Sequence, residues 1–431
     1  MSRPRTWVSV LAFALAVGGP RLGLAESPPG AGEVTVDDLV TRALAESPDI
    51  GAARADVEAA HGRLVQAGLR PNPMLDLGGQ KALSPDNNLM IGVTVPLDLN
   101  RRKEGRVGVA ERELEMKRAQ VVDRERRLRA DVRTKAADVL GARRDLEVTD
   151  ELLRVNREAL HLIGERARRG AAPPLDENLL LVEVNRLDAN RRMLESRVEV
   201  FTLQLKALAV WPPEEPLTLT GDLGAAPLVL DRSTGVARAL EQRADLRVAQ
   251  ADAAMARAKI LKEQAEGRWD ASISVNYQRQ DFGFNLNGIT NQGAIRPIQD
   301  VFHYFGGTVN ITLPVRNQNQ GNVAAARAEA AGADRRIELA VLTIRQEVEG
   351  AFTQYEGAQR SLEIYARGVR DVARQNLDVV RKTYELGRAS LLDVVAEQRR
   401  YIDIEMGYTD VLKQVYTAAV EIERAVGAAT R

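Results

Sequence analysis

Two long stretches without proline decide what this chain can fold into. No proline occurs between Pro96 and Pro173, and none follows Pro314. In both stretches apolar residues recur at intervals of three and four with charged residues between them, which is typical of a helix with a narrow apolar seam. Because a helix rises about 1.5 Å per residue, helices over 105–168 and 321–386 would each be about 100 Å long. Such helices exclude a small globule and predict a rod or a tube.

The chain also repeats itself once. Three landmarks occur twice in the same order, at 43–50 and 239–246, at 93–97 and 311–315, and at 170–176 and 387–393. Matched landmarks in one order predict an internal duplication. The first repeat is expected over 26–210 and the second over 231–431.

Both repeats are expected to follow one order of elements: a helix, a strand pair, a very long helix, a tight turn and a returning helix. The strand pair, long helix and turn are predicted over 73–97, 105–168 and 169–174 in the first repeat, and over 269–315, 321–386 and 387–390 in the second. A proline-rich connector, 211–230, joins the repeats. Gly170 is expected to end its helix in a left-handed conformation, and Ser390 to cap the second returning helix. The predicted fold class is mainly α with a smaller β part.

The strands alternate apolar and polar residues, as in 269–278 and 305–313. Alternation places one set of side chains on each face of a sheet. An ordinary half-buried sheet has this pattern, and so has a tilted strand of about ten residues that crosses a bilayer. Four strands are too few to close a barrel, so a membrane barrel would have to be shared among several chains. The dipeptide Asn287-Gly288 is expected in a turn.

The first 25 residues indicate export. Arg3 and Arg5 precede an apolar run over 7–17, and Gly23 and Ala25 are small residues suited to cleavage by signal peptidase. The segment 1–25 is therefore interpreted as a signal peptide, because its apolar run is too short for a spanning helix. The alternative is a membrane-anchored N-terminus.

Composition excludes several classes of function. Basic and acidic residues balance at 60 each, which argues against a nucleic-acid-binding protein. The chain has no cysteine, so thiolate sites and a lipid-modified N-terminal cysteine are excluded, and its three histidines are scattered. Motifs for phosphate binding, zinc hydrolysis and nucleophilic catalysis are missing from the sequence. We expect no enzyme, no metal site and no cofactor.

The second tight turn carries a resemblance to a known family. The segment 384–395, Tyr-Glu-Leu-Gly-Arg-Ala-Ser-Leu-Leu-Asp-Val-Val, is similar to the second-repeat turn of the TolC-like outer-membrane efflux family. The resemblance extends over 34–427. It implies a homotrimer in the outer membrane of a Gram-negative bacterium, with four strands per chain forming a twelve-stranded transmembrane β-barrel. The helices would form a tunnel across the periplasm, and the connector 211–230 would join an equatorial belt around it.

The resemblance also implies roles at the tip of the tunnel. Tyr384 matches a tyrosine that helps to close the tip, while Asp393 and Asp176 match acidic residues of the constriction. A periplasmic adaptor protein would dock at the tip turns, which contain Gly170, Gly387 and Ser390. The simpler roles are stabilisation of a first helical turn for the two aspartates and packing at a helix end for Tyr384.

Two positions depart from the family pattern. Arg388 lies one place before the family's arginine position, which holds Ala389, and Glu397 lies one place after its second aspartate position, which holds Ala396. One residue turns a helix by about 100°. Neither Arg388 nor Glu397 can therefore be assumed to replace the shifted residue.

The function implied by the resemblance is a passive exit duct of a tripartite efflux pump. An adaptor would join the trimer to an inner-membrane transporter of the resistance–nodulation–division type. Segments 66–73 and 316–321 look closest to outer-membrane components of cobalt–zinc–cadmium-type systems, which favours heavy-metal efflux. Multidrug efflux and type I protein secretion are alternatives within the family. A soluble periplasmic coiled-coil scaffold is a remote alternative, and an exported enzyme on a helical frame has almost no support.

Overall fold

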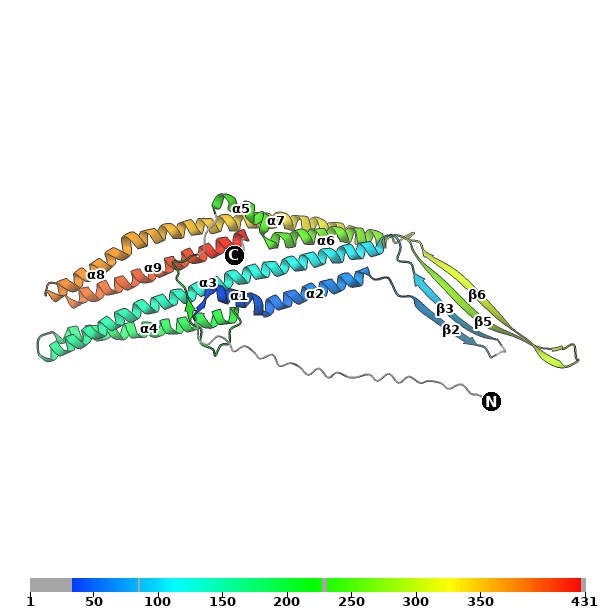
Figure 1. Cartoon of the computed structure of the whole chain (residues 1–431), viewed down its shortest axis with the longest axis horizontal. Coiled ribbons are helices and arrows are strands. Elements are labelled where there is room, and N and C mark those ends of the chain that lie inside the picture. The colour runs from blue at the N-terminus through cyan, green and yellow to red at the C-terminus, as the bar shows by residue number, and fades with distance from the viewer. Residues whose placement is uncertain (1–32, 84–85, 227–230, 428–431) are drawn as a thin grey trace, which may run out of the picture.

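The computed structural model describes residues 33–83, 86–226 and 231–427. The predicted signal peptide, 1–25, lies outside these residues, as does the end of the connector, 227–230. The described chain is elongated, with helices along most of its length and a four-stranded sheet at one end (Figure 1). The prediction of a mainly α chain with a smaller β part is confirmed.

The first half contains one unbroken long helix, α3, and a shorter returning helix, α4. A single helix was expected before the strands, but two are present, because Pro48 lacks an N–H and starts a new helix. The elements are β1 Val34–Thr35, α1 Val36–Glu46, α2 Pro48–Gly68, β2 Met74–Lys81, β3 Asn87–Pro96, α3 Arg102–Arg168, α4 Pro174–Leu208 and β4 Leu219–Thr220.

The second half has the same order but a different long helix. Its elements are α5 Arg232–Gln242, α6 Ala244–Glu266, β5 Asp270–Ile289, β6 Ile295–Thr312, α7 Gln320–Ile364, the π-helical turn η1 Tyr365–Val369, α8 Arg370–Glu385 and α9 Leu391–Val426.

The single long helix expected over 321–386 is interrupted by η1, so that prediction was wrong at this point. A π turn accommodates an extra residue in the helix. It lies where α9 approaches closely, since a β-carbon on Gly407 would be only 2.8 Å from the Tyr365 hydroxyl. Helical periodicity does not reveal such a contact between distant segments.

The four longer strands form one antiparallel sheet in the order β2-β3-β5-β6. The prediction of a turn at Asn287-Gly288 was wrong, because these residues lie within β5 opposite Pro297 and Arg296. Pairing continues past them, and the chain reverses at 290–294, where Gly293 has a φ of 79°. A left-handed φ is what glycine accommodates without strain.

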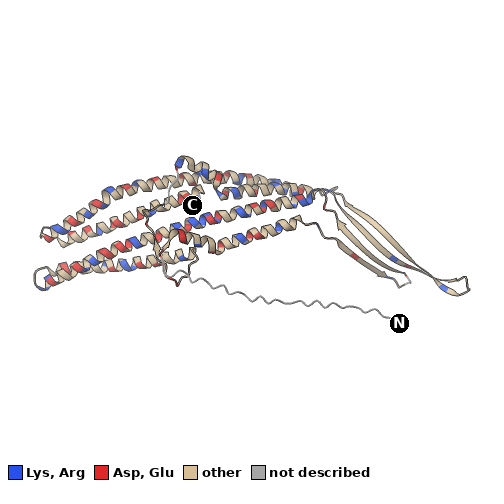
Figure 2. Ribbon diagram, in the orientation of Figure 1, with Lys and Arg blue, Asp and Glu red and all other residues tan. Residues whose placement is uncertain are grey.

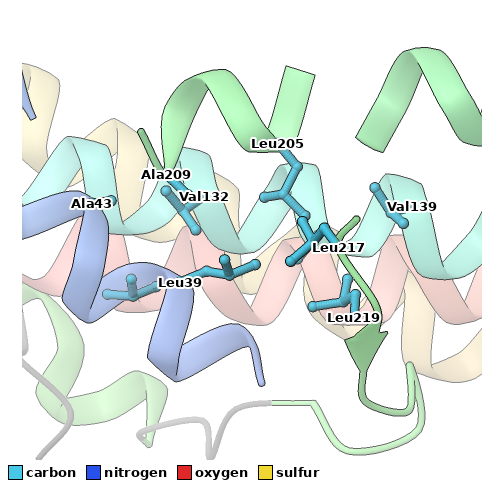
Figure 3. Packing of buried hydrophobic residues seen from close by; sticks show 10 residues of the cluster. Leu39, Ala43, Val132, Val139, Leu205, Ala209, Leu217 and Leu219 are labelled. Atoms are coloured by element: carbon cyan, nitrogen blue, oxygen red, sulfur yellow. The ribbon is translucent and has the colours of Figure 1, made fainter. Parts of the chain in front are cut away.

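The apolar core is divided into clusters along the helices. The cluster in Figure 3 joins α1, α3, α4 and the connector, with Leu39, Val132, Leu205 and Leu219 all buried. Parallel pairing of β1 with β4 adds a backbone link between the start of the described chain and the connector. The middle of the molecule is thus held by contacts between segments far apart in sequence.

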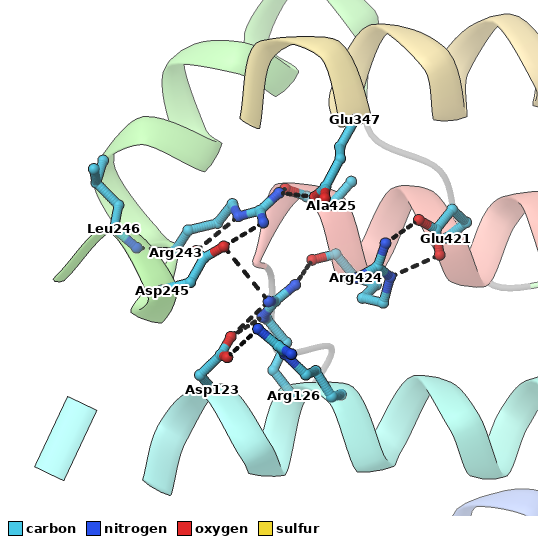
Figure 4. Close-up of polar contacts among 10 residues, drawn as sticks. Asp123, Arg126, Arg243, Asp245, Leu246, Glu347, Glu421, Arg424 and Ala425 are labelled. Carbon is cyan, nitrogen blue, oxygen red and sulfur yellow. Dashed lines mark hydrogen bonds and ion pairs between the residues drawn. The ribbon is translucent and has the colours of Figure 1, made fainter. Parts of the chain in front are cut away.

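A buried polar network holds the end of α9 against α6, α7 and α3. The Arg243 side chain, only 2% exposed, donates hydrogen bonds to Asp245, Glu347 and the Ala425 carbonyl (Figure 4). Arg126 donates to Asp123 and to the carbonyl of Arg424. A buried guanidinium with several acceptors is stabilised where an unpaired one would not be.

Charged residues occur throughout the helices and are sparse on the strands (Figure 2). Among the described helices, none is both long enough and apolar enough to cross a membrane.

Candidate functional site

The two helical hairpins, α3–α4 and α8–α9, both turn at the end of the molecule opposite the sheet (Figure 1). These two turns contain or adjoin every site residue that the sequence predicted. We refer to residues 166–177 and 383–398 together as the tip.

Both tip turns have the same backbone geometry. Gly170 and Gly387 each have a φ of 72°. The N–H groups of Gly170 and Ala171 donate to the carbonyls of Ala167 and Arg166 at 3.0 and 2.8 Å. Those of Gly387 and the next residue donate to the corresponding carbonyls of α8, both at 2.9 Å. This is the Schellman pattern, in which a left-handed glycine satisfies the last carbonyls of a helix, so the predicted left-handed conformation of Gly170 is confirmed.

The returning helices start differently. At α9 the Ser390 hydroxyl accepts from the Asp393 N–H at 3.2 Å, and the Asp393 carboxylate accepts from the Ser390 N–H at 2.9 Å and from its hydroxyl at 2.6 Å. These reciprocal bonds form a capping box and confirm the predicted cap. At α4 the N-cap is Pro173, whose side chain forms no cap bond.

The cap governs the ionisation of Asp393. The hydrogen bonds from the Ser390 hydroxyl and N–H hold the pKa of Asp393 below its ordinary value. Asp176 occupies the matching place on α4, half-buried, and its carboxylate has no hydrogen bond or ion pair within the part of the chain that the structure describes. Its carboxylate is therefore not committed to a helix cap.

Tyr384 lies between the two hairpins. It is half-buried against an apolar cluster of Ile163 and Leu180 from the first hairpin and Leu391 and Val395 from the second. Burial, together with the negative charge of Asp176, raises the pKa of Tyr384. Tyr384 of the second hairpin thus lies within electrostatic range of Asp176 of the first.

Arg388 and Glu397 do not join that pair. Arg388 is exposed on the turn, and no ion pair of its side chain is found among the described residues. Glu397 is buried on α9 and accepts a hydrogen bond from Arg400 at 2.8 Å. Its other oxygen has no partner among the described residues.

One contact between the hairpins was missed by the sequence analysis. Glu183 on α4, only 1% exposed, accepts hydrogen bonds from Arg399 on α9 at 2.8 and 3.1 Å and from Arg186. Burial opposes ionisation of Glu183, but these guanidinium hydrogen bonds outweigh it and lower its pKa. The sequence did carry a signal for this contact, because Glu183 places a carboxylate on the apolar seam of the helix between Leu180 and Leu187.

At the other end, the sheet has two chemically different faces. One, called here the apolar face, exposes Leu75, Leu77, Ile91, Val93, Val275 and Val309. The opposite one, the polar face, carries Asp76, Thr94, Ser274, Asn276 and Gln278. On the polar face the hydroxyl of Thr94 lies 2.9 Å from that of Ser274 and donates to Asp76 at 2.7 Å. Such a sheet can lie between an apolar and an aqueous phase.

The tip offers hydrogen bonds, charge and apolar contact. The described residues include no cluster of three or more histidine, aspartate or glutamate side chains that could hold a metal ion. The geometry of the tip is suited to a contact surface or a constriction.

Comparison with known proteins agrees with this arrangement. The model of the family described as outer membrane efflux protein matches residues 39–203 and 235–428. The cobalt-zinc-cadmium resistance protein CzcC of Cupriavidus metallidurans is 22% identical over 435 residues, covering 97% of this chain and 98% of that protein.

Solved structures share the fold. CusC matches with a TM-score of 0.74 at 15% identity, covering 91% of this chain and 92% of that one. The outer-membrane channel OprN matches with a TM-score of 0.72 at 19% identity, covering 91% and 89%. VceC of Vibrio cholerae matches with a TM-score of 0.70 at 17% identity, covering 91% and 96%.

The matched relatives are efflux components and channels, so the chain is not an enzyme. The family model covers most of both repeats, including both tip turns. The chain belongs to the outer membrane efflux protein family.

Proposed function

We propose that three copies of this chain form an exit duct, with a twelve-stranded barrel in the outer membrane and a helical tunnel in the periplasm. One observation carries the proposal. A single chain has a four-stranded sheet with an exposed apolar face, and its edge strands β2 and β6 lack an outer partner among the described residues. Unpaired backbone groups are not tolerated in lipid, and closure of the sheet removes them.

Extraction and mass measurement test this proposal. The duct should stay in the outer-membrane fraction until detergent is added, and light scattering should then give three chains per particle. Release by osmotic shock as a monomer would instead support the soluble coiled-coil scaffold and contradict the duct.

The tip is proposed as the narrow end of the duct, with Asp176 and Asp393 near its axis. The Asp393 carboxylate is engaged by Ser390, whereas Asp176 is not engaged by a cap. In single-channel recordings, Asp176→Asn should therefore weaken block by multivalent cations more than Asp393→Asn does. Glu158→Gln, in an exposed pair with Arg154, is the control. Unchanged block in both aspartate variants would remove these residues from the constriction.

Adaptor docking is proposed at the two turns around Gly170, Gly387 and Ser390. Leu175, Leu386 and Leu392 leave 64%, 73% and 59% of their surface exposed beside these turns, which suits a contact with another protein. Leu386→Glu should reduce co-purification of the adaptor while the trimer stays intact. Met193→Glu, at an exposed site along α4, is the matched control and should leave co-purification unchanged.

Heavy-metal cations are the proposed substrates, supplied by a resistance–nodulation–division transporter through the adaptor. The support is the resemblance of segments 66–73 and 316–321 and the name of the relative CzcC. A deletion strain should become sensitive to cobalt, zinc or cadmium salts and recover with the gene restored. Sensitivity to drugs alone would contradict metal efflux and support multidrug efflux.

A further inference from the structure

The hairpin of β5 and β6 projects beyond the rest of the sheet (Figure 1). β3 pairs with β5 only as far as Asn87 opposite Asp281, whereas β5 and β6 remain paired to Ile289 opposite Ile295. Past Asp281, β5 and β6 form a two-stranded ribbon among the described residues, and near its base the N–H of Gly283 donates to the Asp86 carboxylate at 2.9 Å. Such a ribbon is marginally stable in water on its own.

The apolar side of β5 and β6 changes where the ribbon begins. In the part shared with β3, the apolar residues of β5 are Ile273, Val275 and Tyr277, which lie on the apolar face of the sheet. In the ribbon they are Phe282, Phe284, Leu286 and Ile289, of which Phe282 and Phe284 precede the register shift. Successive residues of a strand point to opposite sides, so these two phenylalanines continue the side of the polar face. No bulge causes the change, because the register with β6 is regular from Asp270 to Phe284.

Strand β6 also places apolar residues on this side, although Val301 and Ile295 remain on the other side. Ile298, opposite Phe284, and Phe302, opposite Gln280 at the base of the ribbon, share the side of the two phenylalanines of β5. We call Phe282, Phe284, Ile298 and Phe302 the ribbon patch.

Two aromatic clusters mark this reversal. On the apolar face, the rings of Tyr277 and Phe305 lie 5.1 Å apart and the Tyr277 hydroxyl lies 2.7 Å from Nδ1 of His303. On the opposite side, Phe282 and Phe302 meet edge to face with ring centroids 5.7 Å apart. The ribbon patch remains open, since Phe284 leaves 61% and Phe302 42% of its surface exposed.

The position of the ribbon patch identifies what covers it. In the proposed barrel the polar face looks into the lumen, so the ribbon patch, which continues that face, looks inward over the outer mouth. The groups that meet it there are the same patches of the other two copies. The outward side of the ribbon carries Asp281 and Gln299 beside Arg279, and it also carries the apolar residues Val301, Ile295 and Ile289.

We propose that the three ribbons lean together over the outer end of the duct and bury their ribbon patches against one another as an apolar constriction. The inference rests on the proposed trimeric duct. An apolar constriction hinders hydrated ions because water leaves it readily. The outer mouth would then limit ion flow independently of the tip.

Cysteine crosslinking tests the contact directly, because the natural chain has no cysteine. Phe284→Cys places a thiol in the ribbon patch, and a short bismaleimide applied to whole cells should link two chains covalently. Gln299→Cys is the matched control, since Gln299 is opposite the neighbouring residue, Gly283, on the outward side. It should give no link. Ile298→Cys, opposite Phe284, serves as a second patch position if the first variant assembles poorly.

Conductance provides the functional readout. The double variant Phe282→Ser, Phe302→Ser should raise single-channel conductance by about twofold or more if apolar side chains narrow the mouth. Val301→Ser, on the outward side of the same ribbon, should leave conductance unchanged.

The outcomes separate this inference from the duct itself. Trimers that conduct normally but show neither the Phe284→Cys link nor the rise in conductance would overturn the constriction and leave the duct intact. Quenching of a fluorophore at Phe284→Cys by nitroxide-labelled lipid would also overturn it, because the patch would then face lipid. Wild-type protein that neither forms trimers nor conducts would contradict the duct.

Discussion

The two tip turns have the same backbone, yet they treat the first acidic residue of the returning helix differently. Gly170 and Gly387 have equal φ angles and equivalent hydrogen bonds. After the second turn, Ser390 binds the carboxylate of Asp393, whereas after the first turn Pro173 leaves Asp176 without a cap bond. The duplicated backbone is thus independent of the side chains that follow it. The same turn geometry is followed by one carboxylate that is hydrogen-bonded in a helix cap, Asp393, and by one that is not, Asp176.

The difference extends into the helices. Ten residues after each turn glycine, α4 buries Leu180 and α9 buries Glu397. The long helix of the first hairpin is unbroken, while that of the second contains η1. The hairpins are therefore related in backbone path and distinct in the charges they bury, and Glu183 with Arg399 is a buried polar link between α4 and α9.

Breaking that link should have the largest effect. Glu183→Ala removes the buried acceptor of Arg399, and opening of the tip should become easier by about 2 kcal/mol, less than for a fully buried pair because both arginines are half exposed. Hydrogen exchange of α4 and α9 amides near the contact should accelerate by about 30-fold. Glu158→Ala, in an exposed pair with Arg154, should change exchange by less than about twofold. Equal effects of the two variants would contradict the role of Glu183.

The contribution of Asp145, a second carboxyl group near α9, to stability should depend on pH in the direction opposite to that of Glu183. Burial raises the pKa of Asp145, on α3, to about 6. Hydrogen bonding by Thr409 and the charges of Arg197 and Lys413 oppose the rise, while Asp410 adds to it. Because the folded state holds this proton more tightly than the unfolded state, the contribution of Asp145 to stability falls as pH rises from about 4 to about 6 and then stays level. Asp145→Asn should therefore stabilise the protein at pH 7 by about 1 kcal/mol and have little effect near pH 4.

Thermal unfolding midpoints across this pH range measure the effect, and Glu183→Gln provides the contrast. The folded-state pKa of Glu183 lies below its ordinary value. Its contribution is thus fully present above the unfolded pKa and is lost as pH falls through the folded pKa. Glu183→Gln should destabilise at pH 7 and less so in acid. The same pH trend in both variants would contradict the opposite shifts.

The equality of the two turns can be tested with alanine. A β-carbon on Gly170 or Gly387 would meet no atom within 4 Å, so only the positive φ opposes substitution. Gly170→Ala and Gly387→Ala should each destabilise the tip by about 1 kcal/mol, measured by hydrogen exchange. Gly62→Ala, within α2 and also free of nearby atoms, should instead stabilise by up to about 1 kcal/mol. Clearly unequal effects at the two turns would show that the surroundings, not φ, control them.

The smallest effect is expected at the cap. Ser390→Ala removes the hydroxyl from the capping box and should weaken the start of α9 by up to about 1 kcal/mol. It should also move the pKa of Asp393 upward toward its ordinary value, because the Ser390 hydroxyl is the main cause of its lowering. An NMR titration of labelled aspartate measures this shift. A pKa that stays low in the variant would assign the lowering to another group.

Much of the tip could be predicted from the sequence because it is local. Gly170, Gly387 and Ser390 act through the conformation of their own turns, and their glycine and cap signals are visible in a short window. The contacts of Arg388 and Glu397 could not be predicted in the same way, because a shift of one place on a helix changes which neighbour a side chain meets. The structure leaves Arg388 exposed and buries Glu397 beside Arg400.

The sheet shows a similar division. Alternation in β5 and β6 predicted strands correctly, but Asn287-Gly288 was interpreted as a turn because the local dipeptide favours one. Cross-strand pairing carries these residues further along β5. Pairing partners lie at a distance in sequence, so a short window does not contain them.

The sequence by itself determined the long helices, the two glycine turns and the strands, because proline spacing, apolar periodicity and capping chemistry act within a few residues. Only the tertiary structure decided that Glu183 contacts Arg399, that η1 interrupts the second long helix beside Gly407, and that β5 and β6 extend beyond the neighbouring strand β3. Each of these features depends on which distant segment lies opposite. That choice is made by packing and register, which couple residues across the whole chain.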